Sequence, residues 1–203
     1  MDNKKEKPLP SFLDQIFKSG NIKPENIPNI DLYMDQVTTF MDKHLASFKR
    51  HEDDKILTKT MINNYAKNRL LPPPNKKKYS KEHMLLLIFI YYFKNILSIN
   101  DIQTLMKPLT SNFFSNHSDI NLEEIYSEIF ALSDGQLDKL MENIKGDYNL
   151  AAEQFTSVEE DADREYLQLF TFVCLLSFDV YLKKQMIESL IDNLDKKDHD
   201  KKK

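Results

Sequence analysis

Eight basic side chains lie between Lys55 and Lys81 without a single Asp or Glu among them. They are seven lysines and one arginine, so this segment carries a charge of +8 in a chain whose formal net charge is −4. The remaining residues hold 20 basic and 32 acidic side chains and sum to −12. Such segregation increases self-repulsion without building a core, and it is typical of a site for a polyanion. A run of like charge is also commonly just a solvated surface, and that interpretation stays open here.

Within the basic segment, residues 58–68 have helical periodicity with two different faces. Thr58 is a suitable N-cap, and Pro72-Pro73-Pro74 prevents the helix from continuing. Counting about 100° per residue, one half of the helix, roughly 0–140°, is polar and the other half is apolar. The polar half holds Lys59, Thr60, Asn63, Asn64 and Lys67, and the apolar half holds Met61, Ile62, Tyr65 and Ala66. We expect the apolar half to pack on the domain.

The polar half has the groups that read base edges in a major groove. Asn pairs bidentately with adenine, Lys donates to guanine acceptors, and the Thr methyl contacts the thymine methyl. The lysine-rich loop Lys76-Lys77-Lys78, which ends at Tyr79, would contact phosphates and supply affinity without sequence information. The predicted recognition residues are Thr58, Lys59, Thr60, Asn63, Asn64 and Lys67.

The composition favours a helical protein without disulfides. There are three glycines, no Trp and long stretches without Pro. Cys174 is the single cysteine, which suits a reducing cytoplasm, and its apolar neighbours indicate an inert core residue rather than a redox sensor. The hydrophilic residues at the N-terminus lead into no apolar signal core. The most apolar run, Tyr166 to Leu182, is shorter than the roughly 20 residues of a spanning helix, so we predict a soluble cytoplasmic protein with no membrane partner.

Capping residues and apolar spacing predict the remaining helices. We expect a short helix from Ser11 to Lys18, a longer one beginning at Asp31, one opened by Ser80 with His83, and a short one from Ser98 that ends at Pro108. Three more follow: about 122–132, about 134–145 ending at Gly146, and a long one opened by Ser157 with Glu160.

Several of these residues resemble the amino-terminal half of a MerR-type winged helix-turn-helix. They are the run Leu57 to Tyr65, then Leu70 to Pro74, then Tyr79-Ser80. Residues of about 31–109 resemble more closely the bacterial domain-of-unknown-function 1836 family. The chain departs from the MerR pattern because Arg69 stands in place of Gly, Asn63-Asn64 replaces Arg-Tyr, and a charged loop follows a longer first helix.

The resemblance implies an all-α fold: a MerR-like winged helix-turn-helix with a small wing, followed by a helical carboxy-terminal subdomain. It also implies that Tyr65 reaches a phosphate while its ring packs inside. The predicted phosphate and wing residues are Tyr65, Arg69, Asn75, Lys76, Lys77, Lys78, Tyr79 and Lys81. The predicted organisation is a lead and short helix in 1–30, a DNA-binding domain in 31–109, an acidic helical region in 110–198 and a disordered tail in 199–203.

Residues 119–200 hold 20 acidic and seven basic side chains, a net charge of −13. In MerR-type regulators the corresponding region dimerises and senses an effector, so the resemblance implies a homodimer through the carboxy-terminal helices. The apolar residues from Leu167 to Leu194 cover a broad arc. Two interpretations remain open for them, a dimer interface and the core of this subdomain itself.

No arrangement in the sequence predicts catalysis. Three glycines do not build a phosphate-cradling loop, and the five histidines show no metal spacing. His51, beside three acidic residues, is better explained by a solvated loop than by a metal site. We therefore expect that the protein is not an enzyme and that it binds no cofactor and no metal. The predicted function is sequence-specific binding of double-stranded DNA as a transcriptional regulator; the alternative is a protein-interaction module in which the winged helix docks an acidic protein.

Overall fold

A computed structural model describes residues 22–115 and 119–200, and the helix expected over Ser11–Lys18 lies outside them. The described chain is mainly helical with a two-stranded sheet, as predicted from its composition. It divides into two compact units. One unit takes residues 22–132 together with the chain from Ile187, and we call it the basic unit because it contains the basic segment Lys55 to Lys81. The other takes Ser133–Met186, and we call it the hairpin unit.

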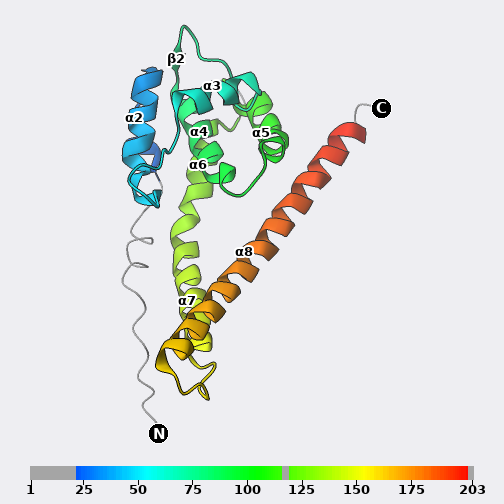
Figure 1. Ribbon diagram of the computed structural model, residues 1–203. Coiled ribbons are helices and arrows are strands. Elements are labelled where there is room, and N and C mark those ends of the chain that lie inside the picture. Colours follow the sequence, from blue (N-terminus) through cyan, green and yellow to red (C-terminus); the bar gives the residue numbers. More distant parts are fainter. Residues whose placement is uncertain (1–21, 116–118, 201–203) are drawn as a thin grey trace. The chain divides into compact units, whose positions relative to one another are not determined.

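The basic unit begins with short elements and continues in helices (Figure 1). In chain order they are η1 (Pro24–Asn26), β1 (Leu32–Tyr33), α2 (Met34–His44), η2 (Ala46–Phe48), α3 (Lys59–Lys67), β2 (Lys78–Tyr79), α4 (Lys81–Lys94), α5 (Ile99–Phe113) and α6 (Leu122–Ala131). β1 and β2 pair antiparallel, with Leu32 opposite Tyr79 and Tyr33 opposite Lys78. In Figure 1 the loop between α3 and β2 projects beyond both helices that flank it, α3 and α4.

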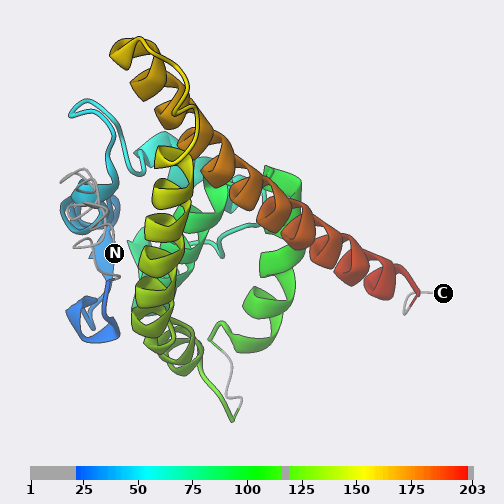
Figure 2. The ribbon, with the colours of Figure 1, turned by 90° about the horizontal axis from the view of Figure 1, so that it is seen from below.

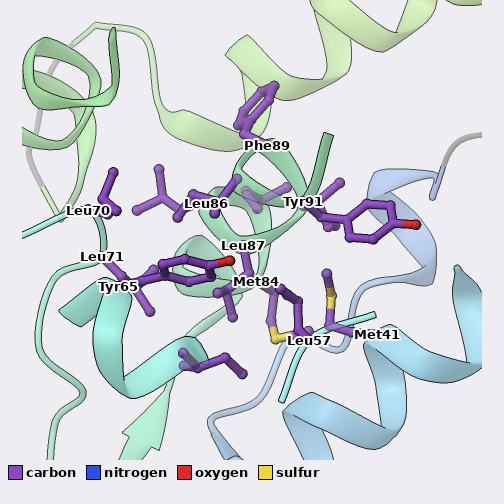
Figure 3. Packing of buried hydrophobic residues seen from close by; sticks show 14 of the residues in the cluster. Met41, Leu57, Tyr65, Leu70, Leu71, Met84, Leu86, Leu87, Phe89 and Tyr91 are labelled. Carbon is purple, nitrogen blue, oxygen red and sulfur yellow. The ribbon is translucent and has the colours of Figure 1, made fainter. Parts of the chain in front are cut away.

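Helix α4 is the centre of the basic unit. All nine residues from His83 to Tyr91 are buried, so this helix is apolar around its whole circumference. Figure 3 shows Met84 and Leu87 of α4 lying between Leu71 on one side and Met41 of α2 on the other. The core therefore joins α2, α4 and the turn that follows α3.

The caps expected from the sequence form at three helix starts. The Thr58 side chain accepts a hydrogen bond from the Met61 N–H at 3.2 Å and begins α3. Ser80 begins α4, and Ser98 begins α5 with Asp101 as its reciprocal partner. Helix α6 also falls where it was predicted.

Two predicted boundaries in the basic unit are wrong. The helix expected from Asp31 begins at Met34, because Leu32 and Tyr33 are extended and pair with β2. Helix α5 does not end at Pro108 but continues to Phe113. Its last turns are held by Leu109, which packs against the core, and by hydroxyl groups that donate to the Lys107 carbonyl, including Ser111 Oγ at 2.8 Å.

The hairpin unit consists of α7 (Ser133–Ala152) and the first part of α8 (Asp161–Asp200). The Gln168 side chain is buried and donates from Nε2 to the carbonyls of Ala152 (2.8 Å) and Gln154 (2.9 Å), which ties α8 to the end of α7. The rings of Tyr148 and Phe172 meet edge to face at 5.4 Å. A cavity of about 280 Å³ lies against this contact, with Gln168 in its wall.

Two helix ends in the hairpin unit also differ from the prediction. Helix α7 passes through Gly146 instead of ending there; a glycine inside a helix costs only about 1 kcal/mol, so it weakens but does not stop a helix. Helix α8 begins at Asp161, four residues after the expected cap at Ser157. Ser157 lies instead in a turn after Phe155, whose φ is 56°, and Arg164 donates to the Val158 carbonyl at 2.8 Å.

Helix α8 runs without interruption to Asp200 (Figure 2). It is longer than the apolar run expected from the sequence: within the described residues, 161–194 form a helix long and apolar enough to cross a membrane by length and composition. Core helices of water-soluble proteins can have the same length and composition, so these two properties alone are weak evidence for a membrane-spanning segment. Cys174, expected to be a core residue, is half-buried.

Candidate nucleic-acid interface

Helix α3 exposes the face that the sequence predicts. Lys59, Thr60, Asn63, Asn64 and Lys67 are all exposed. On the opposite face Ile62 is fully buried and Tyr65 is 6% exposed, both within the core cluster. From α5, Gln103 Nε2 donates to the Asn68 carbonyl at 3.0 Å and holds the end of α3. The exposed groups are therefore carried by a helix that is anchored at its apolar side and at its C-terminus.

Helix α3 ends in a Schellman motif with Arg69 at the position that usually holds glycine. Arg69 is in the left-handed region with φ 57°. The Leu70 N–H donates to the Tyr65 carbonyl at 2.9 Å, and the Arg69 N–H donates to the Ala66 carbonyl at 3.2 Å. These are the two hydrogen bonds of the motif. The replacement of Gly by Arg noted in the sequence therefore leaves the turn intact but places a side chain where it is unfavourable.

The lysine-rich loop is a two-residue β-hairpin. Asn75 and Lys78 exchange two backbone hydrogen bonds of 3.1 Å and 2.9 Å, and Lys76 and Lys77 lie between them with φ 48° and 65°. Positive φ at both central residues is the requirement of a type I′ turn, which strongly favours Asn-Gly. Both lysines are exposed. Two adjacent ammonium groups are thus held at the tip of the loop in spite of the conformational cost.

Strand β1 supports this hairpin from outside the basic segment. Tyr33 pairs with Lys78, and the Lys78 ammonium lies 5.3 Å from the centre of the Tyr33 ring. Tyr33 is 55% exposed. Tyr33 is a candidate site residue that the sequence does not predict, because a two-residue strand is too short to show periodicity.

One carboxylate lies at the exposed face of α3. Asp35, in the first turn of α2, forms an ion pair with Lys59, and both side chains are largely exposed. The sequence of α3 itself contains no acidic residue, so this neutralising contact was not predicted. A nucleic acid at this face would compete with Asp35 for the Lys59 ammonium.

Tyr65, Tyr79 and Lys81 do not lie with the exposed group, and Thr58 and Lys78 are only half-exposed. Tyr65 and Tyr79 are buried, and burial raises the pKa of both phenols. Their position indicates a packing role, and a phosphate contact by either of them stays a prediction. Lys81 is directed to α6, where its Nζ lies 2.7 Å from Glu123 Oε1 and its side chain is only 16% exposed. Its charge is therefore already paired within the basic unit.

His83 joins the base of the hairpin to the start of α4. The Ser80 N–H donates to His83 Nδ1 at 3.0 Å, so Nδ1 is an acceptor and the neutral ring carries its proton on Nε2. Nε2 is buried and makes no hydrogen bond, and the ring meets those of Tyr79 and Phe114 edge to face. Burial lowers the pKa of His83, and the nearby backbone of Pro73 only partly opposes this.

The described residues do not bring together a metal site. No group of three or more His, Cys, Asp or Glu side chains within 22–115 and 119–200 is placed to hold a metal ion. Near His51, the side chain of Asp54 contacts the backbone of the loop. Its Oδ2 accepts hydrogen bonds from the backbone N–H groups of Arg50 and His51. This arrangement is a loop turn closed by a carboxylate.

The chain belongs to the family described as domain of unknown function (DUF1836), which matches residues 22–129. The match covers all of β1, β2 and α2 to α5, and nearly all of α6. The resemblance to this family found in the sequence is therefore confirmed, and the MerR-like winged helix-turn-helix stays a prediction. Comparison with curated proteins gives no match. Comparison with solved structures gives none either.

Proposed function

We propose that the protein binds double-stranded DNA sequence-specifically as a non-enzymatic transcriptional regulator in the cytoplasm. In this proposal the basic unit is a MerR-like winged helix-turn-helix. Helix α3 enters the major groove, and the hairpin at Lys76-Lys77 is a wing on the phosphates. The protein would act as a homodimer through its carboxy-terminal helices.

The observation that carries the proposal is the conformation of three basic residues beside α3. Arg69, Lys76 and Lys77 all have positive φ at turns where Gly or Asn would be more stable. A left-handed conformation costs an ordinary residue about 1–2 kcal/mol. Unfavourable backbone conformations of this kind concentrate at functional sites. A use for the three charges, such as phosphate binding, explains why they stand at these positions.

The exposed face of α3 supports the assignment of base contacts. Asn63 and Asn64 present amide groups that can pair with adenine, and Lys67 can donate to guanine acceptors. Since no residue of α3 is acidic, the helix itself does not repel a phosphate backbone. The nearby Asp35 carboxylate forms an ion pair with Lys59 and so weakens the attraction of this lysine for a phosphate backbone.

Selection of duplexes from a random pool with the full-length chain tests the proposal. We expect enrichment of a motif arranged as an inverted repeat, because a two-fold symmetric dimer reads two equivalent half-sites. Asn63→Ala should then relax preference at one position of each half-site by about 1–3 kcal/mol, while leaving the other positions unchanged. Failure to retain any duplex at low salt would contradict the proposal and favour an acidic protein as the partner of the same surface.

A further inference from the structure

The cavity of the hairpin unit lies where the end of α7 meets the first turns of α8. Its wall takes residues at helical spacing from both helices, so each set lies on one face of its helix. The wall residues are Tyr148, Ala151 and Ala152 of α7, and Glu165, Gln168, Leu169 and Phe172 of α8. Two of the three residues from α7 are alanines, whose side chains are too small to fill the space between the two faces. A cavity of about 280 Å³ therefore remains.

The cavity has an apolar interior and a carboxylate at its mouth. Ala151 and Phe172 are buried, and the ring of Phe172 meets that of Tyr148 edge to face. Glu165 is exposed, as is Leu169 one turn further along α8, so these two side chains lie toward solvent. The interior suits an apolar or aromatic group, and the mouth suits a group that pairs with a carboxylate.

Acidic residues dominate the segment that builds the cavity. Residues 147–172 hold seven acidic side chains and one basic side chain, a net charge of −6. The basic residue, Arg164, is already engaged: it forms an ion pair with Asp161 and donates to the Val158 carbonyl at 2.8 Å. A pocket formed by such an acidic segment attracts cations and repels anions.

We propose that this cavity binds a small organic amine with an aromatic body. The ammonium group pairs with the Glu165 carboxylate, and the body packs against Phe172 and Leu169 inside. The volume has room for roughly nine non-hydrogen atoms, taking about 30 Å³ for each, the share of one water molecule in the liquid. A phenyl ring with a two-carbon ammonium chain has this size. The proposal goes beyond DNA binding and concerns the hairpin unit alone.

Ligands of other charge fit the same volume less well. A neutral ligand would cover the mouth of the cavity without pairing with Glu165, and an anion would be repelled by the carboxylate. A void that is only imperfect packing would bind apolar bodies without regard to their charge. The preference among ligands of equal size and different charge therefore distinguishes these cases.

Calorimetric titration of the full-length chain with three such ligands tests the proposal. They are 2-phenylethylamine, 2-phenylethanol and phenylacetate: a cation, a neutral alcohol and an anion at neutral pH. We expect one molecule of the amine to bind with a dissociation constant of about 1 mM or tighter, an affinity within reach of so small a ligand. The alcohol should bind at least about tenfold more weakly, and the anion more weakly still. Equal binding of all three, or no binding of the amine at about 10 mM, would overturn the proposal.

Removing the carboxylate at the mouth locates the ammonium group. Glu165→Gln keeps the size of the side chain and should weaken amine binding by about tenfold, with little effect on the alcohol. Asp163→Asn is the matched control, because it removes the same charge from the acidic segment two residues away but outside the wall. It should change amine affinity by less than about twofold. An equal loss in both variants would show a general attraction to the acidic segment and overturn the proposal.

Filling the cavity locates the aromatic body. Ala152→Met extends a side chain from the wall and should abolish binding of the amine and of the alcohol. Thermal unfolding with and without the amine shows that each variant is folded, and the ligand should raise the midpoint of the parent and of Asp163→Asn but not that of Ala152→Met. Undiminished amine binding by Ala152→Met would place the ligand elsewhere and overturn the proposal. If this variant does not fold, the comparison of Glu165→Gln with Asp163→Asn still decides, since both replaced side chains are exposed.

These measurements use no nucleic acid, so they are separate from the test of DNA binding. A chain that binds the amine but retains no duplex would contradict the proposed function and leave the amine site intact. A chain that binds duplex but discriminates no amine would do the reverse.

Discussion

The Lys78 ammonium lies over the ring of Tyr33, 5.3 Å from its centre, at the register where β1 and β2 pair. This contact connects the first strand of the basic unit to the base of the hairpin. The next two residues toward the tip, Lys77 and Lys76, are exposed and in the left-handed region. The sheet therefore fixes where the charged tip of the loop is held relative to the start of α2.

Replacing the tip by the sequence that a type I′ turn prefers should separate stability from binding. We expect Lys76→Asn/Lys77→Gly to raise the free energy of unfolding by about 1 kcal/mol, because Asn-Gly adopts positive φ more readily than Lys-Lys. The same variant should bind duplex DNA less tightly. The negative slope of log K against log salt should become smaller in magnitude by about 2. Urea unfolding and fluorescence anisotropy measure the two effects.

The matched control for the hairpin is Lys76→Ala/Lys77→Ala. It removes the same two charges but keeps ordinary side chains at positive φ, so it should weaken DNA binding equally without any gain in stability. Equal DNA affinity of the parent and both variants would exclude the hairpin tip as a phosphate contact.

The end of α3 offers a second test of the same kind. Arg69→Gly should stabilise the protein by about 0.5–1 kcal/mol, since glycine is the favoured residue at this position of a Schellman motif. Arg69→Ala keeps a side chain at φ 57° and should give no such gain. Thermal unfolding of the two variants compares them directly. If both were destabilised to the same extent, the Arg69 side chain would be contributing to stability through contacts of its own.

Releasing Lys59 from its carboxylate partner should strengthen DNA binding. We expect Asp35→Asn to raise duplex affinity by about two- to fivefold at moderate salt, because Lys59 then binds DNA without first breaking an ion pair with Asp35. Asp42→Asn is the control: this acid of the same helix pairs with Lys49 at 2.7 Å, outside the basic segment. An equal gain in both variants would indicate a general effect of net charge and not a contact at α3.

Acidification should destabilise the protein in part through His83. Its pKa is lowered in the folded state, so the unfolded chain binds a proton more readily. The resulting loss in the free energy of unfolding is absent above the ordinary His pKa of about 6.5. It grows as the pH falls below that value toward the folded-state pKa. His83→Gln keeps an acceptor for the Ser80 N–H at the third position of the capping box. In urea unfolding between pH 5 and 8, this variant should lose less stability on acidification than the parent does; an unchanged pH dependence would show that His83 does not contribute.

The sequence was sufficient for the parts of the site that depend on local pattern. Apolar spacing gave the two faces of α3, and the hydroxyl residues Thr58, Ser80 and Ser98 gave three helix starts. These features arise within one or two turns of helix, so they are visible in a short window. The same holds for the amphipathic division between exposed Asn63 and buried Ile62.

The features that sequence reasoning missed depend on contacts between distant segments or on conformational cost. β1 forms because its two residues pair with residues 47 and 45 positions later, and this pairing places the start of α2 at Met34. The sequence predicts helix ends at Pro108 and Gly146, but both residues lie inside helices, because the flanking turns are otherwise stabilised. The ion pairs of Lys59 with Asp35 and of Lys81 with Glu123 are likewise invisible before α2, α4 and α6 are in place.

The salt dependence of duplex binding by the full-length chain is the most direct measurement of the central claim. Titration of a labelled duplex at a series of salt concentrations should give a log K that falls linearly with log salt, with a slope of about −0.9 for each phosphate neutralised. In Lys76→Ala/Lys77→Ala/Lys78→Ala the slope should be smaller in magnitude by about 3. Duplex binding with the same slope in the parent and the triple variant, or no binding at low salt, would contradict the account.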